Sequence, residues 1–231
     1  MRLLCAGDSL TRAQISADYV KAVENVVGGP VLRAGVNLEL SSGLVARLDA
    51  LVAHDATAIT VLTGTNNVRY ALSDSDAKRL RRHWRTTEPQ SLATYREDLR
   101  IIAGRLRDTG ARVALLSLPV VGEVLASEPV RKARDFSEVV REVAAEQGVS
   151  YLPLHERMVD FLEAHPAVPK TLFRPGPFLS YTAAAQNLML RRSFDAISRS
   201  RGLQLTTDTI HLNTRGAAMI AELIVGWLKH G

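Results

Sequence analysis

The sequence predicts one α/β domain in which helices cover a doubly wound parallel sheet. Two observations predict this fold. Short apolar runs alternate with longer helical patterns, and no repeat, low-complexity tract or linker divides the 231 residues. The composition, 46% hydrophobic and 23% charged, is that of an ordinary globular protein. The length suits one large domain, although length alone would also permit two.

The expected strands are five short apolar runs. They cover residues 3–6, 31–34, 58–62, 113–118 and 149–152. The β-branched residues in 58–62 favour a central position in the sheet. Because ligands bind at the carboxyl ends of parallel strands, polar residues that follow these runs are candidates for a functional site.

Helical patterns fill most of the segments between the strands. They cover residues 13–27, 41 or 42 to 53, 91–107, 129–146 and 214–229. Two segments differ. Residues 72–90 are polar and are expected to be irregular. Residues 164–205 hold three prolines between positions 169 and 177 and then an amphipathic pattern near 183–199. We interpret them as an insertion that forms a lid, a dimer contact or part of the core.

A candidate nucleophile follows the first strand, in Gly7-Asp8-Ser9-Leu10. A serine at this point stands at the base of the sheet crevice and at the N-terminus of the next helix. The free N–H groups of that helix end would stabilise an oxyanion. The alternative is that Ser9 only caps the helix.

A candidate general base lies just before the last helical pattern, in Asp208-Thr209-Ile210-His211. An aspartate three residues before a histidine can direct its carboxylate onto Nδ1 of the ring, which leaves Nε2 free to take a proton from a serine. Alone this spacing is a weak signal. With Ser9 in place, it predicts a catalytic Ser9, His211 and Asp208.

Two further candidates follow the second and third strands. Gly35 comes after residues 31–34, and Asn66 lies in Gly64-Thr65-Asn66-Asn67, after residues 58–62. A glycine N–H approaches a substrate oxygen closely, and an asparagine amide is a neutral donor for an oxyanion. Either residue alone is more often part of a turn.

Together these four blocks resemble the GDSL, or SGNH, hydrolase superfamily, from residue 3 to residue 228. The resemblance implies a three-layer α/β/α, flavodoxin-like sheet of order 2-1-3-4-5. It implies hydrolysis of carboxylic esters through an acyl-enzyme, without a cofactor. It also implies an oxyanion hole formed by Ser9, Gly35 and Asn66. The family usually has aspartate where Asn67 stands, so we expect an altered hydrogen-bond network there.

Residues beside the catalytic blocks are expected to line the substrate or to support the catalytic groups. They are Asp8, Leu10, Asn67, Val120 and Leu212. The three apolar members are as easily ordinary packing residues. The acyl chain is expected to be short to medium in length, and the substrate to be a small-molecule ester.

Several alternatives stay open. A carbohydrate deacetylase, a thioesterase or an acyltransferase would use the same residues. A binding module for nucleic acid or an anionic surface would use the basic run 78–85, in a chain of net charge +5. No sequence motif indicates a metal site. Cys5, the single cysteine, is expected to be buried. We expect a monomer or homodimer without a membrane span, and a cytoplasmic protein because the run before Gly7 is too short for a signal peptide.

Overall fold

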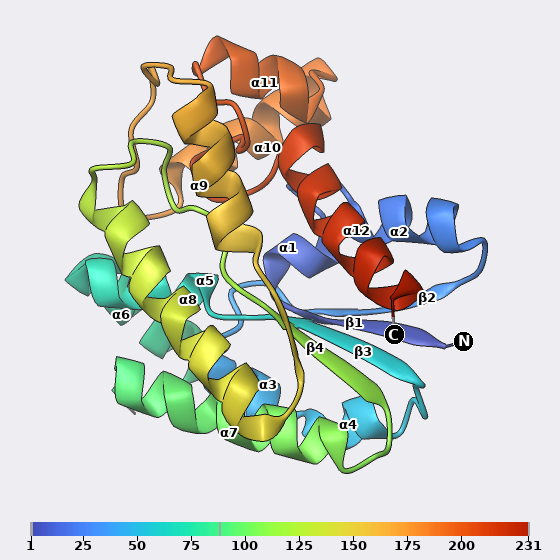
Figure 1. The fold of residues 1–231 in the computed structure, drawn as a ribbon. Coiled ribbons are helices and arrows are strands. Elements are labelled where there is room, and N and C mark those ends of the chain that lie inside the picture. Colours follow the sequence, from blue (N-terminus) through green and yellow to red (C-terminus); the bar gives the residue numbers. More distant parts are fainter. Residues whose placement is uncertain (1, 88, 231) are drawn as a thin grey trace.

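The computed structural model describes residues 2–87 and 89–230. Within them, a parallel sheet has the strand order β2-β1-β3-β4-β5, which confirms the predicted order (Figure 1). The strands are β1 (Leu3–Gly7), β2 (Val31–Gly35), β3 (Ala58–Leu62), β4 (Arg112–Leu116) and β5 (Ser150–Leu152). In the register of β1, Gly7 pairs with Gly35 of β2 on one side and with Leu62 of β3 on the other. The ends of three strands that precede candidate residues therefore lie side by side.

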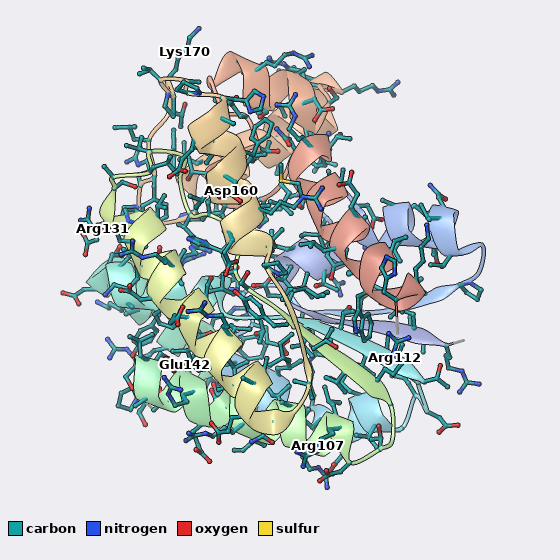
Figure 2. All side chains as sticks on the ribbon, in the orientation of Figure 1. Arg107, Arg112, Arg131, Glu142, Asp160 and Lys170 are labelled. Atoms are coloured by element: carbon teal, nitrogen blue, oxygen red, sulfur yellow. The ribbon has the colours of Figure 1, made fainter. Side chains whose placement is uncertain are left out.

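Helices cover both faces of the sheet. One face packs against α2 (Tyr19–Val27), α9 (Leu154–Ala164) and α12 (Thr214–Lys229), and the other against α3 (Ser41–Ala46), α4 (Leu48–Val52), α7 (Leu92–Arg107) and α8 (Glu128–Gln147). Alternate residues of β1 face opposite ways, so Leu3 and Cys5 join the first core and Leu4 and Ala6 the second. Charged side chains such as Arg131 and Lys170 project outward from these layers (Figure 2).

The helix predicted over residues 13–27 begins later, at Tyr19. A short helix α1 (Ser9–Arg12) ends at Ala13, which has a left-handed φ of 58°, and Asp18 then caps α2. The intervening loop is held by the chain near the C-terminus, because Ala17 N–H donates to the Leu212 carbonyl at 2.9 Å. Tertiary contacts therefore overrode the local helical pattern.

The predicted irregular segment 72–90 is wrong, because most of it is helical. Helix α5 (Thr65–Leu72) is followed at once by α6 (Asp74–Trp84). Ser73 caps α6 by accepting the N–H of Asp76, and acidic residues in the first turn and basic residues in the last favour the helix dipole. Ala77 and Leu80 are the buried apolar residues of α6, and most of the rest of the helix is polar, so the segment resembles an irregular one in composition.

The segment 164–205, which was expected to be an insertion, contains two helices rather than one over 183–199. They are α10 (Phe178–Leu190) and α11 (Phe194–Ser200). Arg191, with a left-handed φ of 49°, ends α10, and the Ser193 side chain caps α11. Both helices lie near the start of α12, at the top of Figure 1. Among the described residues, no helix is long and apolar enough to cross a membrane.

Candidate active site

Ser9 is the first residue of α1, directly after β1 ends at Gly7. The turn is held by Asp8, whose Oδ1 accepts the N–H of Leu10 at 3.0 Å. Burial raises the pKa of Asp8 to about 6, although the Leu10 hydrogen bond opposes the shift. Local sequence therefore explains why Ser9 stands at a helix N-terminus at the carboxyl edge of the sheet.

His211 and Asp208 are held together in the turn before α12. His211 Nδ1 lies 2.7 Å from Asp208 Oδ2, and Asp208 is buried. Burial alone would raise the pKa of Asp208, but the charge and hydrogen bonds of His211, with a further hydrogen bond from Ser180, lower it to about 2. The carboxylate is therefore ionised at neutral pH, and it favours the tautomer with the proton on Nδ1.

The fold brings Ser9 and His211 together across 202 residues of sequence. Ser9 Oγ lies 3.1 Å from His211 Nε2. With the ring proton on Nδ1, Nε2 is the acceptor and the serine hydroxyl the donor. A second hydrogen bond holds the two segments together: Leu212 N–H donates to Ser16 Oγ, in the loop that follows α1, at 3.0 Å. The arrangement can remove a proton from Ser9 during attack on an electrophile.

A cavity of about 170 Å³ opens beside Ser9 and His211. Its wall comes from the loop after α1, the loop after β2, helices α5 and α6, and the start of α10. The remaining lining residues are Ile15, Asn37, Leu38, Arg69, Arg79, Pro177, Ser180 and Tyr181. The cavity is well below the ~300–1,000 Å³ of sites for drug-sized ligands. The segment 164–205 thus forms part of the wall, through the first turn of α10.

Asn66 lies behind the catalytic turn, in the first turn of α5. Its Nδ2 donates to the Glu39 carbonyl at 3.0 Å and to Asp8 Oδ2 at 3.5 Å. Its Oδ1 accepts a hydrogen bond from Arg69 at 3.3 Å. The hydrogen bond to Asp8 is at the limit of hydrogen-bond length, so it holds this side of the amide weakly.

Gly35 is not among the residues that line the cavity. It is buried against α1, where a Cβ would lie 2.7 Å from the Thr11 carbonyl carbon and 2.8 Å from the Asp8 carbonyl oxygen, and would also meet Arg12 N. The residues from the loop after β2 that line the cavity are Asn37 and Leu38, and Leu38 has a left-handed backbone with φ 60°. The structure therefore gives Gly35 a packing role, which the expectation of an oxyanion donor overlooked.

Leu10, Val120 and Leu212 also lie away from the cavity. All three are fully buried in the core between the sheet and α2, α9 and α12, so they pack as ordinary core residues rather than forming an acyl pocket. Asn67 is fully buried too. Its Nδ2 donates to Ser41 Oγ at 2.8 Å and to Gln90 Oε1 at 2.9 Å, and its Oδ1 accepts Ser41 N–H at 3.1 Å. Its network therefore joins α5 to α3 and not to the Ser9 turn.

The basic run 78–85 lies on α6 and the residue after it. Arg79 lines the cavity and pairs with Asp76. Trp84 is half-buried and donates from Nε1 to the Leu38 carbonyl at 2.6 Å, while Arg81 lies over the Tyr70 ring. The tryptophan thus supports the loop that carries Leu38.

Sequence reasoning missed the two arginines of the cavity, whereas the α10 residues belong to the segment 164–205, for which a lid was one expectation. A signal for Arg69 was present, because it lies three residues after Asn66 and so shares a helix face with it. No comparable signal linked Arg79, Ser180 or Tyr181 to Ser9, because they come from segments whose packing only the fold determines. Within the described residues, no group of three or more His, Cys, Asp or Glu side chains is placed to hold a metal ion.

Comparisons with known proteins show the family of the chain and the fold that it shares. A model of the GDSL-like lipase/acylhydrolase family matches residues 5–219. No match was found among curated proteins. The acetyl xylan esterase AlAXEase is similar in structure, with a TM-score of 0.69 and 14% identity, over 99% of this chain and 100% of that one.

Two further structures show the same fold. A lipase/acylhydrolase from Enterococcus faecalis has a TM-score of 0.62 and 16% identity, over 99% of this chain and 96% of that one. A catalytic serine-to-alanine mutant of Axe2, an acetylxylan esterase from Geobacillus stearothermophilus, has a TM-score of 0.68 and 15% identity, over 97% and 92%. Catalytic mutants of Axe2 at an aspartate and a histidine are similar as well.

Proposed function

Because the chain belongs to the GDSL-like lipase/acylhydrolase family and is a carboxylic ester hydrolase, we propose that Ser9, His211 and Asp208 are its catalytic triad. The observation that carries this proposal is the continuous chain of contacts from Asp208 through His211 to Ser9, at 2.7 and 3.1 Å. The aspartate and histidine mutated in Axe2 are three positions apart, as Asp208 and His211 are, which supports the assignment.

The proposed reaction is a two-step acyl transfer. Ser9 Oγ attacks the ester carbonyl while His211 Nε2 takes its proton, and Asp208 stabilises the imidazolium that forms. His211 then protonates the leaving alcohol, which leaves the acyl group on Ser9. Water, activated by the same ring, releases the acid and restores the serine.

The proposed oxyanion hole is built around the N–H of Ser9, at the start of α1. Asn66 remains a candidate donor, since its 3.5 Å contact with Asp8 is weak enough to be exchanged for a negatively charged oxygen. We place Leu38 ahead of Gly35 as the backbone donor from the loop after β2. Leu38 lines the cavity, and among the described residues none accepts a hydrogen bond from its N–H.

The size of the cavity favours a short acyl group. We expect hydrolysis of 4-nitrophenyl acetate and butyrate to be much faster than that of the octanoate ester. Ser9→Ala should lower kcat on the acetate by several orders of magnitude, while Ser200→Ala, at the end of α11, should match the wild type. Wild-type rates in Ser9→Ala would end the proposal.

A second candidate is deacetylation of a sugar ester. Tyr181 lines the cavity from α10 and is 69% exposed, so its ring is available to stack on a sugar at the entrance. Release of acetate from acetylated xylo-oligosaccharides, lost in Ser9→Ala and reduced in Tyr181→Ala, would support it. Hydrolysis of simple acetates alone would favour the first candidate.

A further inference from the structure

Two arginine side chains line the cavity that contains Ser9 and His211. Arg69 comes from α5 and Arg79 from α6. Their side chains are 4% and 26% exposed, so both guanidinium groups are largely withdrawn from water. A buried guanidinium is costly unless anions or acceptors surround it. Their presence beside a nucleophile therefore needs an explanation.

The carboxylate of Asp76 accounts for only one of these two charges. Arg69 lies 3.3 Å and Arg79 3.1 Å from the same oxygen, Oδ1 of Asp76. The N–H of Gly176 also donates to that oxygen, at 3.3 Å. Three donors thus share one acceptor atom, and the pair of arginines keeps one positive charge beyond what Asp76 offsets.

Asp8 and Asp208 also act electrostatically on Arg69, but among the described residues neither forms an ion pair with Arg69 or Arg79. Asp208 is held by His211 and lies within the field of another cation, Arg201. Glu39 is paired with Arg47 at 2.6 Å.

The two guanidinium groups also have hydrogen-bonding capacity to spare. Each carries five N–H donors. In the described part of the chain, Arg69 donates to Asn66 and Asp76, and Arg79 donates to Asp76. The Nε atoms of both arginines are buried without a partner among the described residues. An anion in the cavity would meet donors that are already fixed in place.

We propose that Arg69 and Arg79 bind a carboxylate of the substrate, so that the preferred substrates are small esters with a negative charge close to the scissile bond. A planar carboxylate matches the fork of N–H groups that a guanidinium presents. The small cavity places such a group within a few bonds of the ester carbonyl. The inference rests on the proposed function, because it assigns the substrate class of the same site.

Matched esters that differ only in charge test this proposal. In the first pair the variable group is on the acyl side: monoethyl succinate is anionic, and ethyl 4-oxopentanoate is its neutral counterpart. In the second pair it is on the alcohol side: acetylglycolate is anionic, and acetoxyacetone is neutral. A charge-assisted hydrogen bond predicts a kcat/KM at least ~10-fold higher for the anionic ester in one of the pairs. Equal values in both pairs would overturn the inference, while hydrolysis of the neutral esters would leave the proposed function standing.

Variants of Arg79 connect the preference to the cavity. Arg79→Gln leaves Asp76 paired with Arg69, so it is the safer substitution for folding. It should reduce the ratio of anionic to neutral kcat/KM to near 1, and Arg79→Lys should restore part of it. Arg82→Gln, on the exposed side of the same helix, should keep the wild-type ratio. A ratio unchanged in Arg79→Gln would contradict the inference.

Binding to an inactive protein separates this inference from the proposed function. Calorimetric titration of Ser9→Ala with monoethyl succinate and acetylglycolate should give a Kd at least ~10-fold tighter than that of the neutral partner in one pair, and the difference should be lost when Arg79→Gln is added. Equal Kd values in both pairs would refute the charge preference. This measurement decides the question even if no ester in the panel is hydrolysed.

Discussion

Asp208 holds His211 through two atoms at once. Its Oδ1 accepts the backbone N–H of His211 at 2.7 Å, and its Oδ2 lies 2.7 Å from the ring Nδ1. The first contact sets the turn and the second sets the tautomer. Because both come from one carboxylate, the local fold of this turn and the tautomer of the ring depend on the same residue.

Replacing Asp208 by asparagine should keep the turn and lose the catalysis. The amide oxygen can still accept the backbone N–H, but an NH₂ group facing Nδ1 favours the wrong tautomer. By analogy with other triads we expect kcat on 4-nitrophenyl acetate to fall by about 10³–10⁴-fold. Circular dichroism should show a folded protein. Asp160→Asn, on the exposed face of α9 (Figure 2), is the control and should be fully active. A fall of less than tenfold in Asp208→Asn would argue against the triad.

Gly35→Ala tests whether Gly35 serves packing or catalysis. The substitution keeps the backbone N–H, so a purely catalytic role predicts little change. The added Cβ would instead meet the backbone of Asp8, Thr11 and Arg12, in the helix that begins with Ser9. We expect the free energy of unfolding in urea to drop by about 1–3 kcal/mol, with a loss of activity as α1 shifts. Gly29→Ala, where a Cβ meets nothing within 4 Å, should leave both unchanged.

Asn67→Asp, which introduces the family's usual residue, should destabilise this chain. Both donors of the Asn67 amide are used, toward Ser41 and Gln90, and the site is fully buried. A carboxylate there would face acceptors and carry an unpaired charge, at a cost of about 1–3 kcal/mol at pH 7. Urea unfolding should show a smaller cost at pH 4, where the acid can donate. Asn25→Asp, on the surface of α2, is the control. If Asn67→Asp is as stable as Asn25→Asp, the hydrogen bonds around residue 67 rearrange to accept the carboxylate, and the prediction is wrong.

The raised pKa of Asp8 predicts a pH-dependent stability. Its ordinary value of 3.8 applies to the unfolded chain, whereas burial raises the folded value to about 6. Between these values the folded chain holds more protons, so its contribution to the free energy of unfolding falls as pH rises from about 4 to about 6. The change is about 3 kcal/mol at most.

The variant Asp8→Asn should remove this slope. The difference in unfolding free energy between wild type and variant should therefore change by up to about 3 kcal/mol between pH 4 and pH 7. Any pH-independent effect of the substitution on stability does not alter this change. Denaturant melts at several pH values measure it. Asp160→Asn is the control, and its difference from the wild type in unfolding free energy should not change with pH. If the difference for Asp8→Asn does not change with pH either, the raised pKa of Asp8 is contradicted.

The sequence by itself determined the strands, the position of Ser9 and the pairing of Asp208 with His211. These features are local. An apolar run of five residues forms a buried strand wherever it pairs, and an aspartate three residues before a histidine is within reach of it in a single turn. The strand order followed from the resemblance to known hydrolases, and the structure confirms it.

Only the tertiary structure decided what surrounds Ser9. Arg69, Arg79 and Tyr181 reach the cavity from three helices, none of which the hydrophobic pattern placed correctly. Gly35 was expected in the oxyanion hole because it follows a strand, but only the structure shows that it also packs closely against α1. Such placements depend on how far-separated segments pack against each other, and a linear pattern of residue types carries little information about that packing.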